Sequence, residues 1–234
     1  QVTRGPTVSQ LSDEPVQVLF AMDPSFENSI GHDKRIAQYA SLPNIKVVLN
    51  GPLTSESSFL SGLTTSPAPH LVYLFCHGYA ASGQLLKPDG VKVLRKTIEA
   101  IPDGTAERKA LDTLLRLTSE MDEDSWIFIG DAQIREKKML RQSFFERRRP
   151  IVFLNMCQSA DLLPSMSTGF VRLFLDKNAS AVIGTESPMT AVFASAYAEQ
   201  VLDALFAGET LGTALLRARR HFLQAELRNP LGLA

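Results

Sequence analysis

The alternation of short apolar runs with helical patterns is the feature that most constrains the fold of this chain. Six runs rich in β-branched and aromatic residues predict strands at Val16–Ala21, Ile45–Leu49, Leu71–Cys76, Trp126–Ile129, Ile151–Met156 and Ala179–Gly184. Apolar residues at three- and four-residue spacing predict helices at Asp33–Ala40, Arg108–Met121, Gln133–Phe145, Gly169–Asp176, Thr190–Ala207 and Thr210–Leu223. Strands that are apolar throughout are covered on both faces, so we expect an α/β fold with a mostly parallel sheet between helices.

The balance of charges excludes several classes of protein. Among the 234 residues, 24 Lys and Arg face 25 Asp and Glu, a formal net charge of −1. A near-neutral surface argues against a strongly basic nucleic-acid binder and a polybasic membrane anchor. We therefore expect no direct binding of nucleic acid or membrane by this domain. No apolar run approaches the ~20 residues needed to cross a bilayer, and Gln1–Gln17 lacks the pattern of a secretion signal, so we expect a cytoplasmic location.

The sequence carries no motif typical of a bound metal or cofactor. It contains neither a Gly-rich phosphate loop nor HExxH or CxxC spacing, so we expect no metal and no cofactor. The two cysteines, Cys76 and Cys157, cannot form a disulfide framework of the kind that staples small secreted domains. Each cysteine is therefore a separate candidate for thiol chemistry.

Two of the predicted strands end in residues capable of covalent chemistry. His77 follows the run Leu71–Cys76, and Cys157 follows the run Ile151–Met156. Ligands of parallel α/β sheets bind beyond the carboxyl ends of the strands. If these two strands are parallel neighbours, an imidazole and a thiol emerge at the same edge, which is the composition of a Cys/His nucleophile pair.

The same residues also allow a purely structural interpretation. A cysteine at the end of a buried strand is often a small apolar side chain, and a histidine there is often a satisfied hydrogen-bonding residue. Spacing alone leaves both interpretations open. Cys76 lies inside its apolar run and is predicted to belong to the core, while His32, His70 and His221 lack a strand-end setting and are predicted to be surface or packing residues.

Three segments of the chain resemble one known family. Leu71–Gly78, Pro150–Ala160 and Thr168–Pro188 resemble the CHAT domain, a caspase-like family related to separase, and the resemblance covers residues 15–234. It implies a caspase-like three-layer α/β/α sandwich and a cysteine endopeptidase. It also implies that His77 is the catalytic histidine and Cys157 the nucleophile, with the amides of Gly78 and Cys157 as the oxyanion hole.

The domain organisation follows from composition and from that resemblance. Residues 1–15, rich in Thr, Ser, Pro and Gly, are predicted to be a linker before one domain at residues 16–234. The charged helical pattern within residues 87–124 is more than a minimal caspase-like core needs, and is either a solvated helix or an activation or docking segment. The final segment, Asn229–Ala234, resembles the end of the family domain before its terminal strand, so that strand is expected to be missing.

The resemblance also indicates where a substrate would bind. Its primary pocket corresponds to Asn155 and Asp23, and the loop that contains Glu186 and Ser187 corresponds to the one that lines the preceding subsites. Asp23 either pairs with Arg or Lys of a substrate or caps the turn before Pro24, and the sequence leaves these two roles open.

The function implied is that of an effector domain. We expect a cysteine endopeptidase that cleaves a protein substrate, as part of a larger, regulated bacterial defence or signalling protein. The expected partners are sensor or repeat domains upstream in the same polypeptide, or a regulatory protein. The alternative is a catalytically silent caspase-like interaction module, against which the intact His77, Gly78 and Cys157 argue.

Overall fold

The structure is a computed structural model of the chain. The residues that it describes are 14–26, 31–49, 55–79, 88–105, 107–109, 111–112, 115, 125–130, 132–156, 169–185 and 189–223.

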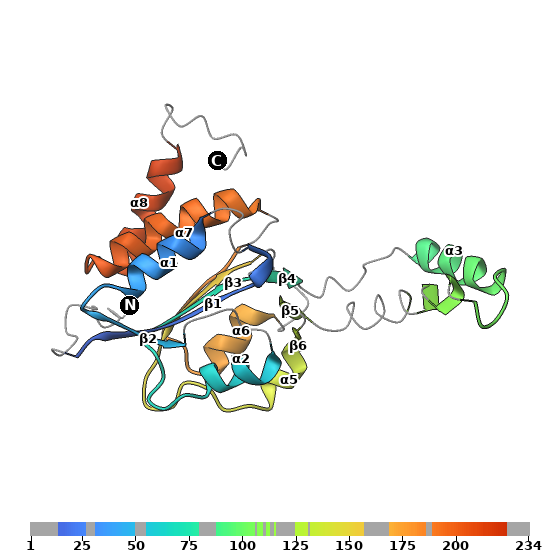
Figure 1. Ribbon diagram of the computed structural model, residues 1–234, viewed down its shortest axis with the longest axis horizontal. Coiled ribbons are helices and arrows are strands. Elements are labelled where there is room, and N and C mark those ends of the chain that lie inside the picture. Colours follow the sequence, from blue (N-terminus) through green and yellow to red (C-terminus); the bar gives the residue numbers. More distant parts are fainter. Residues whose placement is uncertain are drawn as a thin grey trace, which may run out of the picture.

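A five-stranded sheet forms the centre of the molecule (Figure 1). Its strand order is β2-β1-β3-β7-β8, and every neighbouring pair is parallel. The strands are β1 (Val16–Met22), β2 (Ile45–Leu49), β3 (Leu71–Phe75), β7 (Ile151–Asn155) and β8 (Ala181–Ile183). The predicted α/β fold with a mostly parallel sheet is therefore confirmed.

Helices cover both faces of this sheet and complete three layers (Figure 1). One face carries α1 (His32–Ala40), α7 (Ala191–Phe206) and α8 (Leu211–Leu223). The other carries α2 (Glu56–Leu63), α5 (Glu136–Leu140) and α6 (Phe170–Asp176). This arrangement agrees with the three-layer sandwich that the sequence implied.

Strand β3 divides its side chains between two cores. Tyr73 and Phe75 pack in the cluster beneath α1 and α7, whereas Val72 and Leu74 pack in the cluster on the opposite face. Successive strand residues point to opposite faces, so a strand buried on both sides must be apolar throughout. That is why the run at 71–76 carries no helical or alternating pattern.

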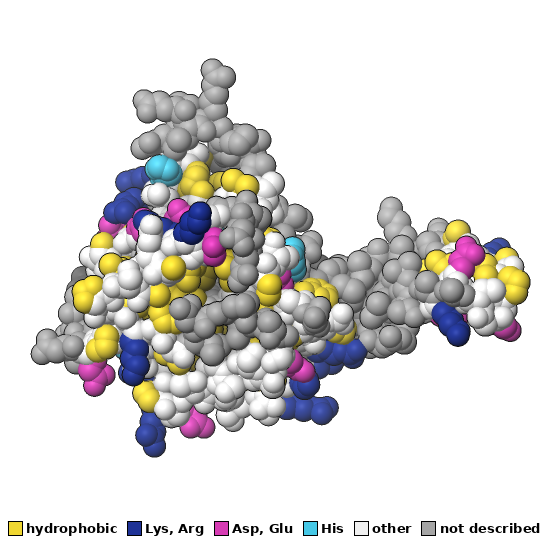
Figure 2. Space-filling model, in the orientation of Figure 1, with side chains coloured by type: hydrophobic (Ala, Val, Ile, Leu, Met, Phe, Trp, Pro, Cys, Tyr) yellow, Lys and Arg dark blue, Asp and Glu magenta, His cyan; other side chains and the backbone are white. Residues whose placement is uncertain are grey.

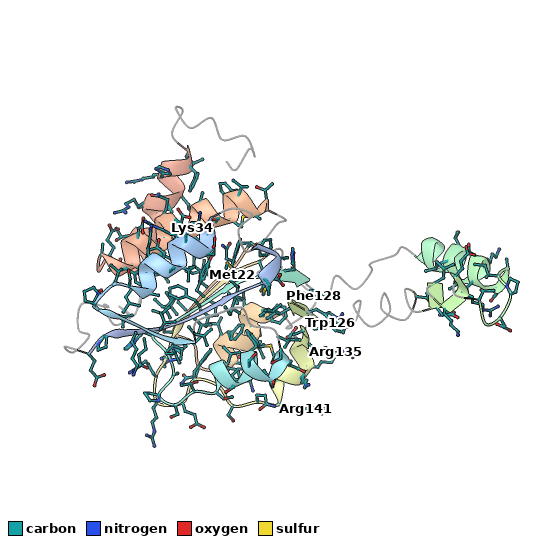
Figure 3. All side chains as sticks on the ribbon, in the orientation of Figure 1. Met22, Lys34, Trp126, Phe128, Arg135 and Arg141 are labelled. Carbon is teal, nitrogen blue, oxygen red and sulfur yellow. The ribbon has the colours of Figure 1, made fainter. Side chains whose placement is uncertain are left out.

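A second, three-stranded sheet lies beside the first. It consists of β4 (His77–Tyr79), β5 (Trp126–Ile129) and β6 (Ala132–Arg135), paired antiparallel in that order. Figure 3 labels Trp126, Phe128 and Arg135 on it, and the Arg135 guanidinium lies 4.5 Å from the centre of the Trp126 ring. A cation over an aromatic face is attractive, and here it joins neighbouring strands.

This second sheet corrects the predicted helix at Gln133–Phe145. The segment instead begins in strand β6, where Ala132 and Ile134 are buried and alternate with exposed neighbours, and then forms the short helix α5. Gly130 turns the chain into β6 with φ of 56°, a backbone conformation that glycine adopts without strain. The apolar residues of β6 and of α5 together match the three- and four-residue spacing of a single helix, which explains the wrong prediction.

One further helix was not predicted, and a second falls within the charged helical pattern expected at residues 87–124. Helix α2 begins at a Ser55 cap, whose hydroxyl accepts a hydrogen bond from the Ser58 amide, and it buries Phe59. Helix α3 (Pro88–Glu99) belongs to the predicted insertion and lies apart from the sheet (Figure 1). Described residues at 107–109, 111–112 and 115 are also helical, after a Thr105 cap that accepts from the Arg108 amide.

Several predictions fall outside the described residues. These are the linker up to residue 13, the missing terminal strand near Leu231, and the remainder of the insertion at 87–124. Within the described ranges, none of the helices combines the length and the hydropathy needed to cross a membrane. Side chains of both charges lie on the face in Figure 2, where several Lys and Arg side chains gather at the lower right of the main body.

The central position of β3 leads to a stability prediction. Leu74→Ala should lower the free energy of unfolding by about 3 kcal/mol, because Leu74 is 0% exposed and its truncation leaves a cavity. Leu140→Ala makes the same chemical change at a side chain that is 47% exposed, and should cost less than about 1 kcal/mol. Urea denaturation of both variants would measure this difference, and equal losses would contradict the assignment of Leu74 to the core.

Candidate functional site

The carboxyl ends of β1, β3 and β7 meet at one edge of the main sheet. Met22 pairs with Phe75, and Phe75 pairs with Asn155, so the three strands end level with one another. His77 follows Phe75 by two residues, and Cys157 follows Asn155 by two. The condition set by the sequence, that these strands are parallel neighbours, is confirmed. Cys157 itself lies outside the described residues, so its distance from His77 stays a prediction.

The His77 side chain is exposed at this edge and braced from one side. A 3₁₀ turn at Pro24–Phe26 follows β1 and contacts it. The Ser25 Oγ lies 3.3 Å from Nε2 of His77, and the Phe26 ring packs against the imidazole with centroids 4.6 Å apart. This turn therefore restricts the orientation of the imidazole while leaving it accessible.

Asp23 caps the turn that braces His77. One carboxylate oxygen accepts a hydrogen bond from the Ser25 amide at 2.8 Å, and the other accepts from the Gly130 amide at 2.7 Å. The side chain is only 3% exposed. Of the two roles that the sequence left open, the structure shows the turn cap, with an added link to the second sheet. A contact between Asp23 and substrate stays a prediction.

Asn155 points beneath the edge rather than out of it. Its Nδ2 donates to the Tyr73 hydroxyl at 2.9 Å and to the Ala194 carbonyl at 3.0 Å, and the residue is 1% exposed. This is not the geometry of a side chain that lines an open pocket, because strand alternation turns Asn155 toward α7, as it does Phe153. Direct contact between Asn155 and substrate stays a prediction.

A buried histidine extends this polar contact, and the sequence did not identify it. His32 is 0% exposed, which agrees with a packing role, but both ring nitrogens are engaged. Nε2 lies 2.7 Å from the Tyr73 hydroxyl, and Nδ1 lies 2.8 Å from Ser195 Oγ. Burial lowers the pKa of His32, and the Glu199 carboxylate opposes that shift. The one sequence feature that could have indicated this buried polar contact is Tyr73, whose hydroxyl is the polar group of an otherwise apolar strand.

Cys76 belongs to the core, as predicted. It is buried, and its Sγ lies 3.6 Å from the Sδ of Met156, on the face of the sheet away from α7. Since a reactive thiol must be accessible to solvent and substrate, this position does not suit a nucleophile.

The remaining predicted residues are described only in part. Gly78 lies in β4, paired with Ile127 of β5. Glu186 and Ser187 fall outside the described residues, but the adjacent Thr185 donates its hydroxyl to the Met156 carbonyl. The loop after β8 is thus tied to the end of β7 at the residue before Cys157.

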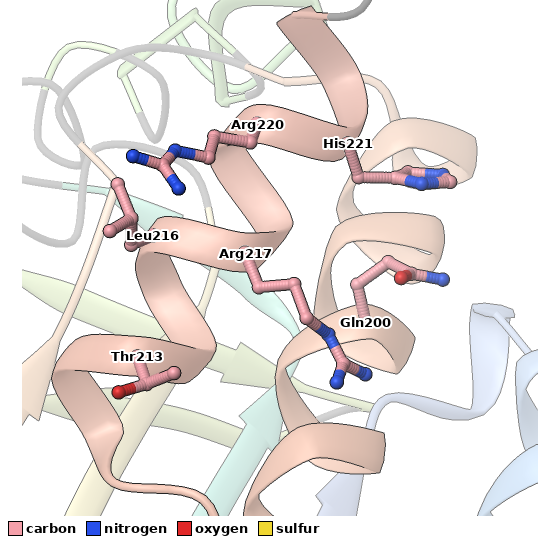
Figure 4. A pocket seen from close by; sticks show the side chains of 6 residues that line it. All are labelled: Gln200, Thr213, Leu216, Arg217, Arg220 and His221. Carbon is pink, nitrogen blue, oxygen red and sulfur yellow. The ribbon is translucent and has the colours of Figure 1, made fainter.

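Away from this edge, a pocket lies between α7 and α8 (Figure 4). It is lined by Gln200, Thr213, Leu216, Arg217, Arg220 and His221. The Arg217 guanidinium donates to the Glu209 carboxylate, so part of this positive charge is balanced. In the part of the chain that the structure describes, no group of three or more His, Cys, Asp and Glu side chains is placed to hold a metal ion.

Comparison with known proteins gives one informative similarity. No family model matches the chain. The chain is similar to a protein of Vitiosangium sp. (strain GDMCC 1.1324) that is named a probable protease, with 26% identity over 231 residues. The similarity covers 97% of this chain and 25% of that protein, so the chain spans about a quarter of the relative's length.

The role of Asp23 leads to a prediction for the turn. Asp23→Ala should lower the free energy of unfolding by about 2 kcal/mol, because it leaves two backbone amides without their charged acceptor. Asp176→Ala removes a carboxylate whose exposed ion pair with Arg172 should contribute about 0.5 kcal/mol or less. Thermal or urea unfolding would compare the two, and a similar small loss in both would contradict the capping role.

The buried histidine leads to a prediction about pH. The unfolded chain takes up a proton at the ordinary histidine pKa of 6.5, whereas folded His32 does so only at lower pH. The unfolded state therefore holds more protons below pH 6.5, and stability should fall as the pH drops through this range.

Urea midpoints between about pH 7.5 and about pH 5.5 would measure this slope. The slope should flatten in His32→Gln and persist in His221→Gln, since His221 lies on the surface of α8. His70, whose pKa burial also lowers, contributes equally to both variants. An unchanged slope in His32→Gln would show that His32 does not titrate in this way.

Proposed function

We propose that this chain is a cysteine endopeptidase domain that uses His77 and Cys157. The observation that carries the proposal is the register of β3 with β7, in which Phe75 pairs with Asn155. The chain leaves the main sheet just after that pair, and His77, the first residue of β4, is exposed at the same edge. Cys157 follows Asn155 by two residues, so a short continuation of the chain past β7 would bring its thiol to this edge.

The arrangement supports acyl transfer to a thiol. His77 accepts the thiol proton, the Cys157 thiolate attacks the scissile carbonyl carbon, and the imidazolium then protonates the departing amine. Water subsequently attacks the acyl-enzyme and releases the carboxylate product. The amides of Gly78 and Cys157 stabilise the oxyanion of each tetrahedral intermediate. The contacts of Ser25 and Phe26 with His77 restrict the ring before substrate arrives.

Two lines of support bear on protease activity. The relative from Vitiosangium is named a probable protease, and the similarity extends over 97% of this chain. The motifs around His77 and Cys157 resemble those of the CHAT family. Because the chain spans about a quarter of the relative's length, we further propose that other domains of such a protein, or a regulatory partner, control the cleavage.

Substrate recognition is proposed to use the loop after β8. Glu186 and Ser187 would line the subsites there, and an extended peptide would pair with the adjoining strand edge through main-chain hydrogen bonds. A carboxylate has about four lone-pair positions, of which backbone amides occupy two at Asp23. A preference for Arg or Lys before the cut would therefore require Asp23 to bind the substrate without releasing its turn.

Mutation of the pair tests the proposed reaction. In the full-length protein, Cys157→Ala and His77→Ala should each reduce hydrolysis of a quenched fluorogenic peptide library by at least about a thousandfold, because each removes a group that acyl transfer needs. Cys76→Ala should retain cleavage, since Cys76 is buried away from the edge. Activity within about tenfold of wild type in either of the first two variants would overturn the pair.

Thiol labelling tests the nucleophile without a substrate. Iodoacetamide should alkylate Cys157 faster than Cys76 in the folded protein, because Cys76 is 3% exposed. Peptide mass spectrometry after brief labelling would locate the modification. Preferential alkylation of Cys76 would remove the assignment, and an unreactive Cys157 with no peptide cleavage would favour a binding module instead.

A further inference from the structure

The buried polar contacts beneath the site have a fixed direction. Because the Ala194 carbonyl can only accept, the atom of Asn155 that faces it must be the amide nitrogen, which also donates to the Tyr73 hydroxyl oxygen. The hydrogen of that hydroxyl then needs an acceptor. His32 Nε2, at 2.7 Å, supplies one if it carries no proton. This sequence of bonds leaves the neutral imidazole protonated on Nδ1.

We call the hydrogen-bonded series Asn155, Tyr73, His32, Ser195 and Glu199 the relay. Its second half follows from that tautomer. The protonated Nδ1 of His32 donates to the Ser195 oxygen at 2.8 Å. The Ser195 hydroxyl then donates to the Glu199 carboxylate at 3.3 Å, so each hydrogen has an acceptor. Glu199 is 33% exposed, which places the charged end of the relay at the surface of α7 and its neutral end beneath the sheet edge.

We propose that Tyr73 and His32 are positioning residues, which hold Asn155 and through it the end of β7. This role rests on the proposed function, because Asn155 precedes the nucleophile by two residues. The relay joins α1, β3, β7 and α7, the elements that meet beneath the reacting edge. Its geometry therefore acts on catalysis without any contact between these two residues and substrate.

The chemistry of the relay distinguishes positioning from ordinary core packing. Its surroundings on the same face of the sheet are apolar, and include Phe75, Phe153 and Ala198. Buried polar groups in such surroundings lower stability unless they are paired. Both Nδ2 hydrogens of Asn155 have acceptors, whereas its Oδ1 has no partner among the described residues, so the amide is held through its nitrogen alone. An apolar side chain at residue 155 would fill space but would not hold the end of β7 in one orientation.

A second tyrosine of the same core provides a matched control. Tyr39 of α1 donates its hydroxyl to Asp203 of α7 at 2.7 Å, and Arg35 donates to both. It is buried like Tyr73 and joins α1 to α7, two of the elements that the relay also joins, but its bonds include neither β3 nor β7. Tyr73→Phe and Tyr39→Phe therefore each remove one buried hydroxyl, but only Tyr73→Phe also removes the contact to Asn155.

The kinetic test uses these two variants in the full-length protein. With the best-cleaved member of a quenched fluorogenic peptide library, Tyr73→Phe should lower kcat about tenfold and leave KM within about twofold, because it misplaces the nucleophile without altering substrate contacts. Tyr39→Phe should change neither by more than about twofold. Equal losses in the two variants, or an unchanged kcat in Tyr73→Phe, would overturn the positioning role.

A spectroscopic test is independent of any peptidase activity. In protein labelled with ¹⁵N-histidine, His32 should show the Nδ1-protonated tautomer. Its pKa should rise in Tyr73→Phe, because the hydrogen bond to the neutral Nε2 is lost, and should stay unchanged in Tyr39→Phe. An Nε2-protonated His32 in wild type would overturn the relay. Absence of both peptide cleavage and Cys157 alkylation in wild type would instead overturn the proposed function, and the positioning role with it.

Discussion

Parallel pairing of β3 with β7 is the interaction on which the candidate site depends. The two strands are about 80 residues apart in sequence, and their backbone hydrogen bonds bring their carboxyl ends level. A shift of one strand by one residue would turn its side chains to the opposite core, so Tyr73 and Asn155 would no longer share a face and their hydrogen bond would be lost. The fit of each side chain in its own core and this buried hydrogen bond therefore favour the register that the proposed chemistry requires.

Polar side chains reinforce this edge where the regular ladder ends. Asp23 uses both carboxylate oxygens to hold backbone amides, one in the turn beneath His77 and one at the turn of the second sheet. Thr185 ties the loop after β8 to the Met156 carbonyl, and Asn155 ties β7 to α7. Strand ends leave backbone groups unpaired, so charged and amide side chains at these positions satisfy them and also fix the loops that carry reactive groups.

The sequence predicted the elements of the main sheet and missed most of the second one. Apolar runs such as Leu71–Cys76 and Ile151–Met156 were identified because strands buried on both faces have no polar positions. Strands of three or four residues, such as β4 and β6, are too short to show a period, and β6 merged with α5 into one apparent helix. Helix α2 was missed although Ser55 and Ser58 form a cap, because its apolar face is only two turns long.

Local sequence patterns account for part of the candidate site, and contacts between distant residues account for the rest. Sequence alone placed His77 and Cys157 after buried strands and assigned Cys76 to the core, because a buried strand is recognisable from a run of consecutive apolar residues. Only the tertiary structure paired β3 with β7, gave the carboxylate of Asp23 to backbone amides, and brought His32 and Ser195 to Tyr73 beneath the edge. Those contacts join residues between two and 163 positions apart, and their partners are chosen by packing and by the need to pair buried polar groups. No periodicity along the chain encodes that choice.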